Sequence, residues 1–152
     1  TGSLDSPTGV ERLSGYKDAL AQHHIALRPE LIAQGKWNPA SGAAAVSELL
    51  SRGETFTALV ASNDDMAIGA MKQLHQLGIK VPEQVSVVGF DDIVLAPYML
   101  PSLASVRVPV TEMIKESINR LIFMLDGGEF NVQQSFPGAL IERESLVAGP
   151  CA

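Results

Sequence analysis

The sequence predicts an α/β fold built on a parallel sheet, and three observations lead to this class. Segments with apolar residues at helical spacing alternate along the chain with short apolar runs of strand length. Asparagine, proline and glycine stand at most of the boundaries between these segments. The apolar runs are continuous rather than alternating, as in strands that are covered on both faces. Strand, helix and strand in succession at these lengths are typical of βαβ crossovers.

The first two thirds of the chain hold the regular part of this pattern. Ser6 and Pro7 predict the start of a helix, and glycines predict the ends of the later helices. The expected elements are a helix over 7–23, a short extended run over 31–33, a helix from Asn38-Pro39 to Gly53, a strand over 57–61, a helix from Asn63 to Gly78 and a strand over 85–90. The run over 57–61 is fully apolar, which predicts a strand buried on both faces.

The last third of the chain is less regular. The expected elements are a loop broken by Pro97 and Pro101, a strand over 105–108, a helix that Thr111 caps and that runs to Leu125, and a last strand over 140–146. Gly127-Gly128 is expected to end the helix, and a polar stretch over 131–135 follows it.

Composition and charge exclude several classes of protein. The 152 residues suffice for one domain with a hydrophobic core. The formal net charge is −6 and the 11 lysines and arginines are scattered, so we do not expect this segment itself to bind nucleic acid. No apolar run approaches the roughly 18 residues of a membrane span, and no signal peptide is recognisable. The single cysteine, Cys151, fits a reducing compartment, and we expect a cytoplasmic protein.

Acidic and amide side chains follow two of the expected parallel strands. Asn63 and Asp91 would lie at the carboxyl edge of the sheet, where open α/β sheets bind their ligands. A carboxylate accepts hydrogen bonds and an amide both donates and accepts them, a combination that suits sugar hydroxyls. A helix cap is the alternative role for such residues, and it remains open. One member of each acidic pair, 64–65 and 91–92, is expected to serve structure.

Two further side chains are candidates for binding. The guanidinium of Arg12 could bind two adjacent hydroxyls or a carboxylate at once, or it could be a solvated helix arginine paired with Glu11 or Asp18. Trp37 is the only tryptophan, and its ring could stack on a sugar or simply pack into the core. Each of these residues is weak evidence when taken alone.

No pattern of catalytic or metal-binding residues is present in the sequence. His23-His24 and His75 lie at helical positions, and no cysteine or histidine spacing suits zinc. A GxSxG elbow, a P-loop and a GxGxxG phosphate cradle are all missing. Asp91 and Asp92 are adjacent, so they point apart and lack the partner carboxylate that glycoside hydrolysis needs. We therefore expect neither an enzyme nor a cofactor or metal ion.

Four segments together resemble the lactose/galactose repressor family of bacterial transcriptional regulators. Arg12–Tyr16 resembles the R-L-x-G-[FYW] helix of that family, and Ser62–Ala70 resembles its N-D-x-M-A-x-G-A segment. Val85–Asp92 resembles the [IV]-S-[IV]-[IV]-G-[FY]-D strand, and Leu103–Val108 resembles the L-[TAS]-[TS]-[IV] segment that follows. The spacing also agrees, so the resemblance covers nearly the whole chain.

The resemblance implies a periplasmic-binding-protein-like fold, in which two lobes, each a three-layer sandwich on a parallel sheet, hold a sugar or similar effector between them. It places residues 1–109 and 134–152 in the C-terminal lobe and the helix within 110–133 in the N-terminal lobe. The C-terminal lobe would lack only its first strand and helix, whereas most of the N-terminal lobe is expected to precede Thr1. The residues implied to line the effector pocket are Ser6, Thr8, Arg12, Trp37, Asn63 and Asp91. Val110 and Met113 would add apolar contacts near the hinge.

The function implied by the resemblance is the effector-binding and dimerisation portion of a DNA-binding repressor of sugar-utilisation genes. DNA would be bound only by an N-terminal helix-turn-helix that this chain does not hold. A homodimer would form through the helix from Asp64 to Leu77 and the loop at Tyr98. No binding to a membrane is expected. Segments 3–7 and 121–128 are closest to repressors of the arbutin–salicin–cellobiose (β-glucoside) type. A periplasmic sugar-binding protein of a transport system is the alternative.

Overall fold

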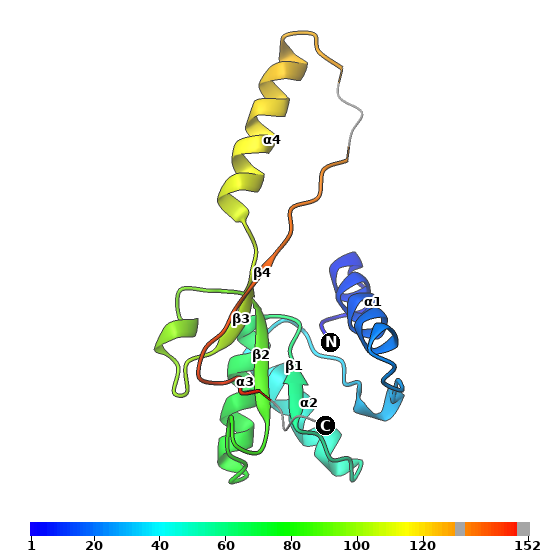
Figure 1. Ribbon diagram of the computed structural model, residues 1–152, viewed down its shortest axis with the longest axis vertical. Coiled ribbons are helices and arrows are strands. Elements are labelled where there is room, and N and C mark those ends of the chain that lie inside the picture. The colour runs from blue at the N-terminus through cyan, green and yellow to red at the C-terminus, as the bar shows by residue number, and fades with distance from the viewer. Residues whose placement is uncertain (130–132, 149–152) are drawn as a thin grey trace.

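The computed structural model of the protein describes residues 1–129 and 133–148 and shows a mainly parallel four-stranded sheet (Figure 1). Its strands lie in the order β1 (Ala58–Val60), β2 (Ser86–Asp91), β3 (Ala104–Arg107) and β4 (Ala139–Ile141). The first three strands are parallel, and β4 returns antiparallel to β3. The predicted α/β class is therefore confirmed.

Two helices pack together beside this sheet. They are α2 (Pro39–Ser51) and α3 (Asp64–Gln76), and α3 lies against β2. Asn38 and Asn63 cap them as predicted, each accepting a hydrogen bond from the backbone N–H three residues on. The positive φ of Gly53 and of Gly78, 74° and 73°, ends both helices in the left-handed conformation that glycine adopts without strain. The fully buried core side chains include Val46, Leu74, Val87 and Leu103.

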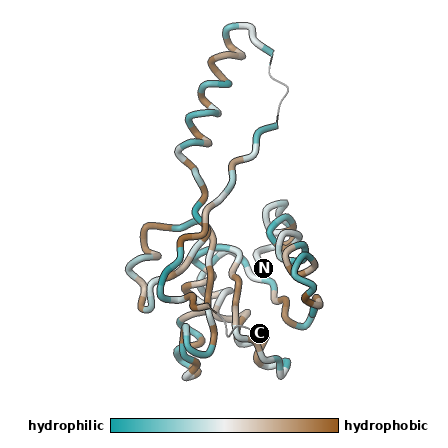
Figure 2. The backbone as a smooth tube through the Cα atoms, in the orientation of Figure 1, coloured by the Kyte–Doolittle hydropathy of each residue, from teal (hydrophilic) through white to brown (hydrophobic). Residues whose placement is uncertain are grey.

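Two other helices stand away from the sheet. The first, α1 (Pro7–Gln22), lies across a cavity of about 1090 Å³ from β1 and α2. The fourth, α4 (Val110–Leu125), extends away from the sheet and carries exposed apolar side chains along its length (Figure 2). Short 3₁₀ turns, η1 (Pro29–Leu31) and η2 (Ala96–Tyr98), lie in the connections. Among the described helices, none is both long and apolar enough to cross a bilayer.

Four local predictions are wrong in detail. Within residues 57–61 only Ala58–Val60 form a strand, and Ala58 and Val60 are exposed rather than buried because the cavity lies beside them. The run over 31–33 joins no sheet, since Pro29 favours a 3₁₀ turn that ends at Leu31. Thr111 caps nothing, because α4 already begins at Val110 behind Pro109.

The last strand is also shorter than predicted. It ends at Ile141, because the chain then turns at residues 143–146 and buries Ser145 against β2 and β3. The predicted polar stretch over 131–135 lies partly outside the described residues, and Cys151 lies wholly outside them.

Candidate functional site

Arg12 joins α1 to the carboxyl ends of β1 and β2. One guanidinium nitrogen donates a hydrogen bond to the carbonyl oxygen of Ser62, which follows β1. Another lies 3.1 Å from the Oδ1 atom of Asp91, the last residue of β2. Arg12 does not pair with Glu11 or Asp18 on its own helix. Its ion pair is made with Asp91, a carboxylate far away in the sequence.

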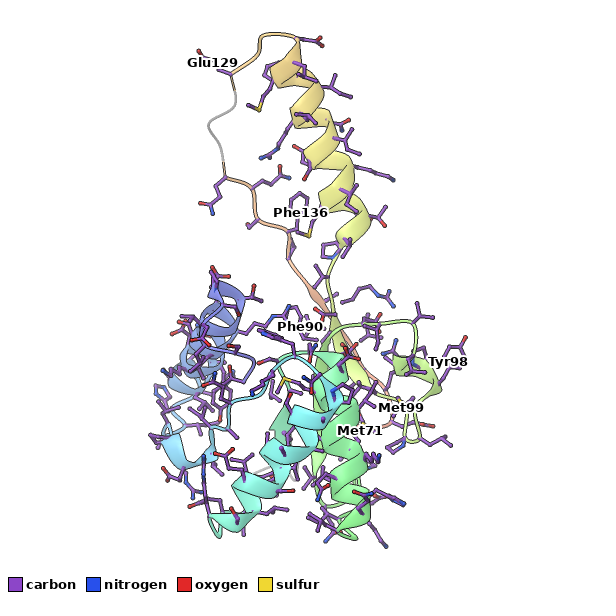
Figure 3. All side chains as sticks on the ribbon, turned by 180° about the vertical axis from the view of Figure 1, so that it is seen from behind. Met71, Phe90, Tyr98, Met99, Glu129 and Phe136 are labelled. Carbon is purple, nitrogen blue, oxygen red and sulfur yellow. The ribbon has the colours of Figure 1, made fainter. Side chains whose placement is uncertain are left out.

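Two aromatic rings flank the same guanidinium. Its central carbon lies 3.9 Å from the ring centroid of Phe90 and 5.5 Å from that of Trp37. Both distances are within the range of a cation–π contact. Figure 3 labels Phe90 at the end of β2, on the side that faces α1. The Arg12 side chain is thus restricted by contacts with two aromatic rings and by hydrogen bonds to two oxygen atoms.

Asn63 has the capping role that the sequence left open, and its amide also contacts the loop that carries Trp37. Its Oδ1 atom accepts a hydrogen bond from the N–H of Met66 at 3.0 Å, which caps α3. Its Nδ2 atom donates to the carbonyl oxygen of Trp37 at 3.3 Å. Trp37 has a φ of 61°, an unusual conformation for a bulky residue, so this bond helps to hold a strained loop. The cap thereby fixes the tryptophan beside Arg12.

The two aspartates after β2 have different environments. Asp91 is 40% exposed at the rim and has the single ion pair with Arg12. Asp92 is only 5% exposed, and its two oxygens each lie 2.6 Å from an arginine, Arg107 or Arg143. Burial opposes the ionisation of Asp92, but the hydrogen bonds and charges of Arg143 and Arg107 outweigh it and hold the pKa of Asp92 below its usual value. Asp92 therefore serves structure, as expected for one member of the pair.

Asp64 is the structural member of the other pair. Its carboxyl group is fully buried, and burial raises the pKa of Asp64 against the opposing effect of hydrogen bonds from Ser105 and Ile93. The Oδ1 atom accepts from the Ser105 hydroxyl at 2.6 Å, and the Oδ2 atom accepts from the N–H of Ile93 at 2.8 Å. Both contacts lie directly beneath the turn that carries Asp91.

The remaining predicted residues contribute less to this cluster. The hydroxyl of Ser6 accepts from the N–H of Gly9 at 3.2 Å and is used as the cap of α1. Thr8 is exposed and lines the cavity beside Arg12. Val110 and Met113 lie on α4, where both are exposed, and Met113 also lines the cavity. The structure thus brings Arg12, Trp37, Asn63 and Asp91 together and leaves the other four at the edge.

Sequence reasoning missed four residues of this site, namely Phe90, Asp64, Ser105 and Arg143. Phe90 and Asp64 lie inside segments that the sequence singled out, but a strand aromatic and an acidic helix start are common features. Ser105 also lies inside such a segment, 103–108, but its partner Asp64 is far away in the sequence, and Arg143 lies outside all of these segments. A guanidinium, an exposed carboxylate and aromatic rings, gathered beside a cavity that Arg12 and Phe90 line, are groups that can bind a polyhydroxylated ring. In the described part of the chain, no cluster of metal-ligating side chains was found.

Known proteins resemble this chain along most of its length. The family described as "Periplasmic binding protein-like domain" matches residues 2–146. The regulator AscG of Escherichia coli K12 is 69% identical over 148 residues, which are 97% of this chain and 44% of AscG. The regulator GalR of the same organism is 37% identical over 137 residues, which are 90% of this chain and 40% of GalR. The chain spans about half the length of the relatives it matches.

Solved structures show the same likeness. The E. coli repressor AscG matches with a TM-score of 0.91 and 68% identity, over 97% of this chain and 54% of the solved one. A complex of the regulator CelR with cellobiose matches with a TM-score of 0.90 and 35% identity, over 95% of this chain and 45% of that one. The chain therefore belongs to the family of periplasmic binding protein-like domains, and the relatives that it matches are transcriptional regulators of the LacI family.

Proposed function

We propose that this chain is the effector-binding portion of a transcriptional repressor that responds to a sugar. The observation that carries the proposal is the position of Arg12, which lines the cavity together with Phe90, pairs with the exposed Asp91 and lies between two aromatic rings. A ligand with adjacent hydroxyls can donate to the free carboxylate oxygen of Asp91 and accept from Arg12. Trp37 and Phe90 offer faces for the apolar side of a sugar ring.

The supporting residues of the proposed pocket have smaller roles. Asn63 acts mainly by holding the Trp37 loop, because both ends of its amide already make hydrogen bonds within the protein. Thr8 would offer a hydroxyl to the sugar from the first turn of α1, whereas Ser6 would act chiefly through the helix start. Val110 and Met113 would make apolar contacts where α4 leaves the sheet.

A β-glucoside is the sugar that we propose as effector. The high identity with AscG and the close structural match with a CelR–cellobiose complex both support this class. No chemistry on the sugar is part of the proposal, since the relatives are regulators and not enzymes. Binding would shift the protein between two states of different operator affinity, a change that needs a coupling of about 1–3 kcal/mol.

The assignment of lobes, partners and compartment belongs to the same proposal. Residues 1–109 and 134–152 would form one lobe and α4 would join the other, which fits the exposed apolar face of α4. A homodimer would use α3 and the loop at Tyr98, where Leu77, Val94 and Leu100 are also exposed. The net charge of −6 supports operator binding by another part of a cytoplasmic regulator rather than by this segment.

Changing Arg12 to lysine is expected to weaken sugar binding by about 10- to 100-fold, because lysine keeps the charge but cannot make the two directed hydrogen bonds. Calorimetric titration of the full-length regulator with cellobiose, salicin, arbutin and galactose measures this change. The matched control is Arg28→Lys, at an arginine paired with Glu30 and Glu54 away from the cavity, which should leave affinity unchanged.

Two results would contradict the proposal. The first is that titration of the unmodified protein gives no heat of binding with any of the four sugars. The second is equal affinity for Arg12→Lys and Arg28→Lys. Release of operator DNA on addition of the bound sugar separates a repressor from a periplasmic binding protein, which would bind the sugar but no operator.

A further inference from the structure

The turn that carries Asp91 is strained. Asp91 has a φ of 109° and Asp92 a φ of 51°, so two consecutive residues other than glycine adopt left-handed conformations. Such conformations are unfavourable for residues other than glycine and persist where surrounding contacts hold them. With the turn in this shape, the Oδ1 atom of Asp91 lies 3.1 Å from the guanidinium of Arg12.

A buried chain of hydrogen bonds holds the turn from below. The N–H of Asp92 donates to the Ser105 hydroxyl at 3.0 Å, and that hydroxyl donates to Asp64 at 2.6 Å. The second oxygen of Asp64 accepts from the N–H of Ile93 at 2.8 Å. The two backbone N–H groups that follow Asp91 are therefore both tied to one buried unit of two side chains.

The packing around this unit leaves little freedom. Asp64 and Ser105 are both fully buried, and a Cβ atom on Gly89 would lie 2.0 Å from the Oδ1 atom of Asp64. The register of the sheet places Gly89 opposite Ser105, so a residue without a side chain stands where the carboxyl group approaches the strand. The position of the carboxyl group is thereby fixed between β2 and β3.

We propose that Asp64 and Ser105 are positioning residues for effector binding, which act by holding the turn that aims Asp91 at Arg12. This inference rests on the proposed function, because it concerns the affinity of the same pocket. Asp64 stands at the first position of α3, so the unit also fixes the start of that helix relative to β2. Neither residue touches the cavity that the sugar would enter.

The first experiment needs no sugar. Hydrogen exchange of the full-length protein, followed by mass spectrometry of peptides over 90–95, is expected to be at least about tenfold faster in Ser105→Ala, because the Asp92 N–H loses its acceptor. The matched control is Ser145→Ala. Ser145 is also fully buried and both donates and accepts, but it contacts Val87 and Ala104 instead of the turn.

The second experiment measures affinity for cellobiose. Ser105→Ala is expected to weaken binding about tenfold, and Ser145→Ala is expected to leave it unchanged at a temperature where both variants are folded. In an Asp91→Asn background the effect of Ser105→Ala on affinity should largely disappear, because the effects of two substitutions that act through the same carboxylate do not add. If Ser105→Ala does not fold, Asp64→Asn replaces it, since an amide cannot accept both of the bonds that the carboxylate accepts.

The outcomes separate this inference from the proposed function. Unchanged exchange over 90–95 in Ser105→Ala would overturn the inference, as would a loss of affinity that is equally large in the Asp91→Asn background. If the unmodified protein binds none of the tested sugars, the proposed function fails. In that case faster exchange in Ser105→Ala alone would still show that the unit holds the turn, and unchanged exchange would show that it does not.

Discussion

Replacing Gly69 with alanine is expected to lower the free energy of unfolding by about 3 kcal/mol. A Cβ atom at Gly69 would lie 1.8 Å from the carbonyl oxygen of Pro39, at the start of α2. From the other helix, a Cβ atom at Gly42 would lie 2.1 Å from the carbonyl oxygen of Met66. These are backbone atoms that no side-chain rotation can move, so the two helices would have to separate. Urea unfolding of the full-length protein, followed by circular dichroism, measures the change.

The matched control is alanine at Gly15 in α1, where an added Cβ atom meets no other atom within 4 Å. This change should leave stability equal or raise it by about 0.5–1 kcal/mol, because glycine in a helix loses more conformational freedom on folding. Equal stability of Gly69→Ala and Gly15→Ala would show that α2 and α3 do not cross as closely as described. The crossing also bears on the site, because α3 begins at the residue that follows Asn63.

The elements that could be predicted from the sequence are those with a local signal. Asn38 and Asn63 mark the starts of α2 and α3, and glycines mark their ends, because caps act through contacts within a few residues. The wrong predictions depend on distant neighbours. The apolar residues of β1 indicate a strand but cannot show that a cavity lies beside it. The end of β4 is set by Ser145, whose partners are Val87 and Ala104.

The candidate site could likewise be predicted only in part. The sequence predicts that Asp91 and Asn63 lie at one edge of the sheet, because the carboxyl ends of parallel strands lie at the same edge. The resemblance to a family, and not the helix alone, makes Arg12 a candidate for the site, but it does not predict the direct ion pair between Arg12 and Asp91. Ser105 was outside the prediction, because a serine in a strand is ordinary until its bond to Asp64, on another element, is seen.

Replacing Asp92 with asparagine is expected to lower the free energy of unfolding by about 3 kcal/mol at neutral pH. Asparagine keeps the shape but removes the charge between Arg107 and Arg143. Arg107 is 57% exposed and can be solvated, whereas Arg143 is 13% exposed and would remain buried without its partner. Glu142→Gln, an exposed carboxylate next to Arg143 in sequence, is the control and should change stability by less than about 0.5 kcal/mol.

The difference between the unmodified protein and Asp92→Asn should depend on pH. The folded-state pKa of Asp92 is held below the value of about 3.9 of a free aspartate, so its stabilisation is fully present above that value. It is lost as the pH falls through the lower pKa of the folded protein, and the two unfolding curves should converge there. The pKa of Asp64 is raised, chiefly by burial, so its own contribution runs in the opposite direction. Burial is the same in both proteins, and only the small part of the shift that comes from the charge of Asp92 differs between them. A difference that stays constant from pH 7 down to the acid limit would show that Asp92 stabilises the protein through its shape and hydrogen bonds rather than through its charge.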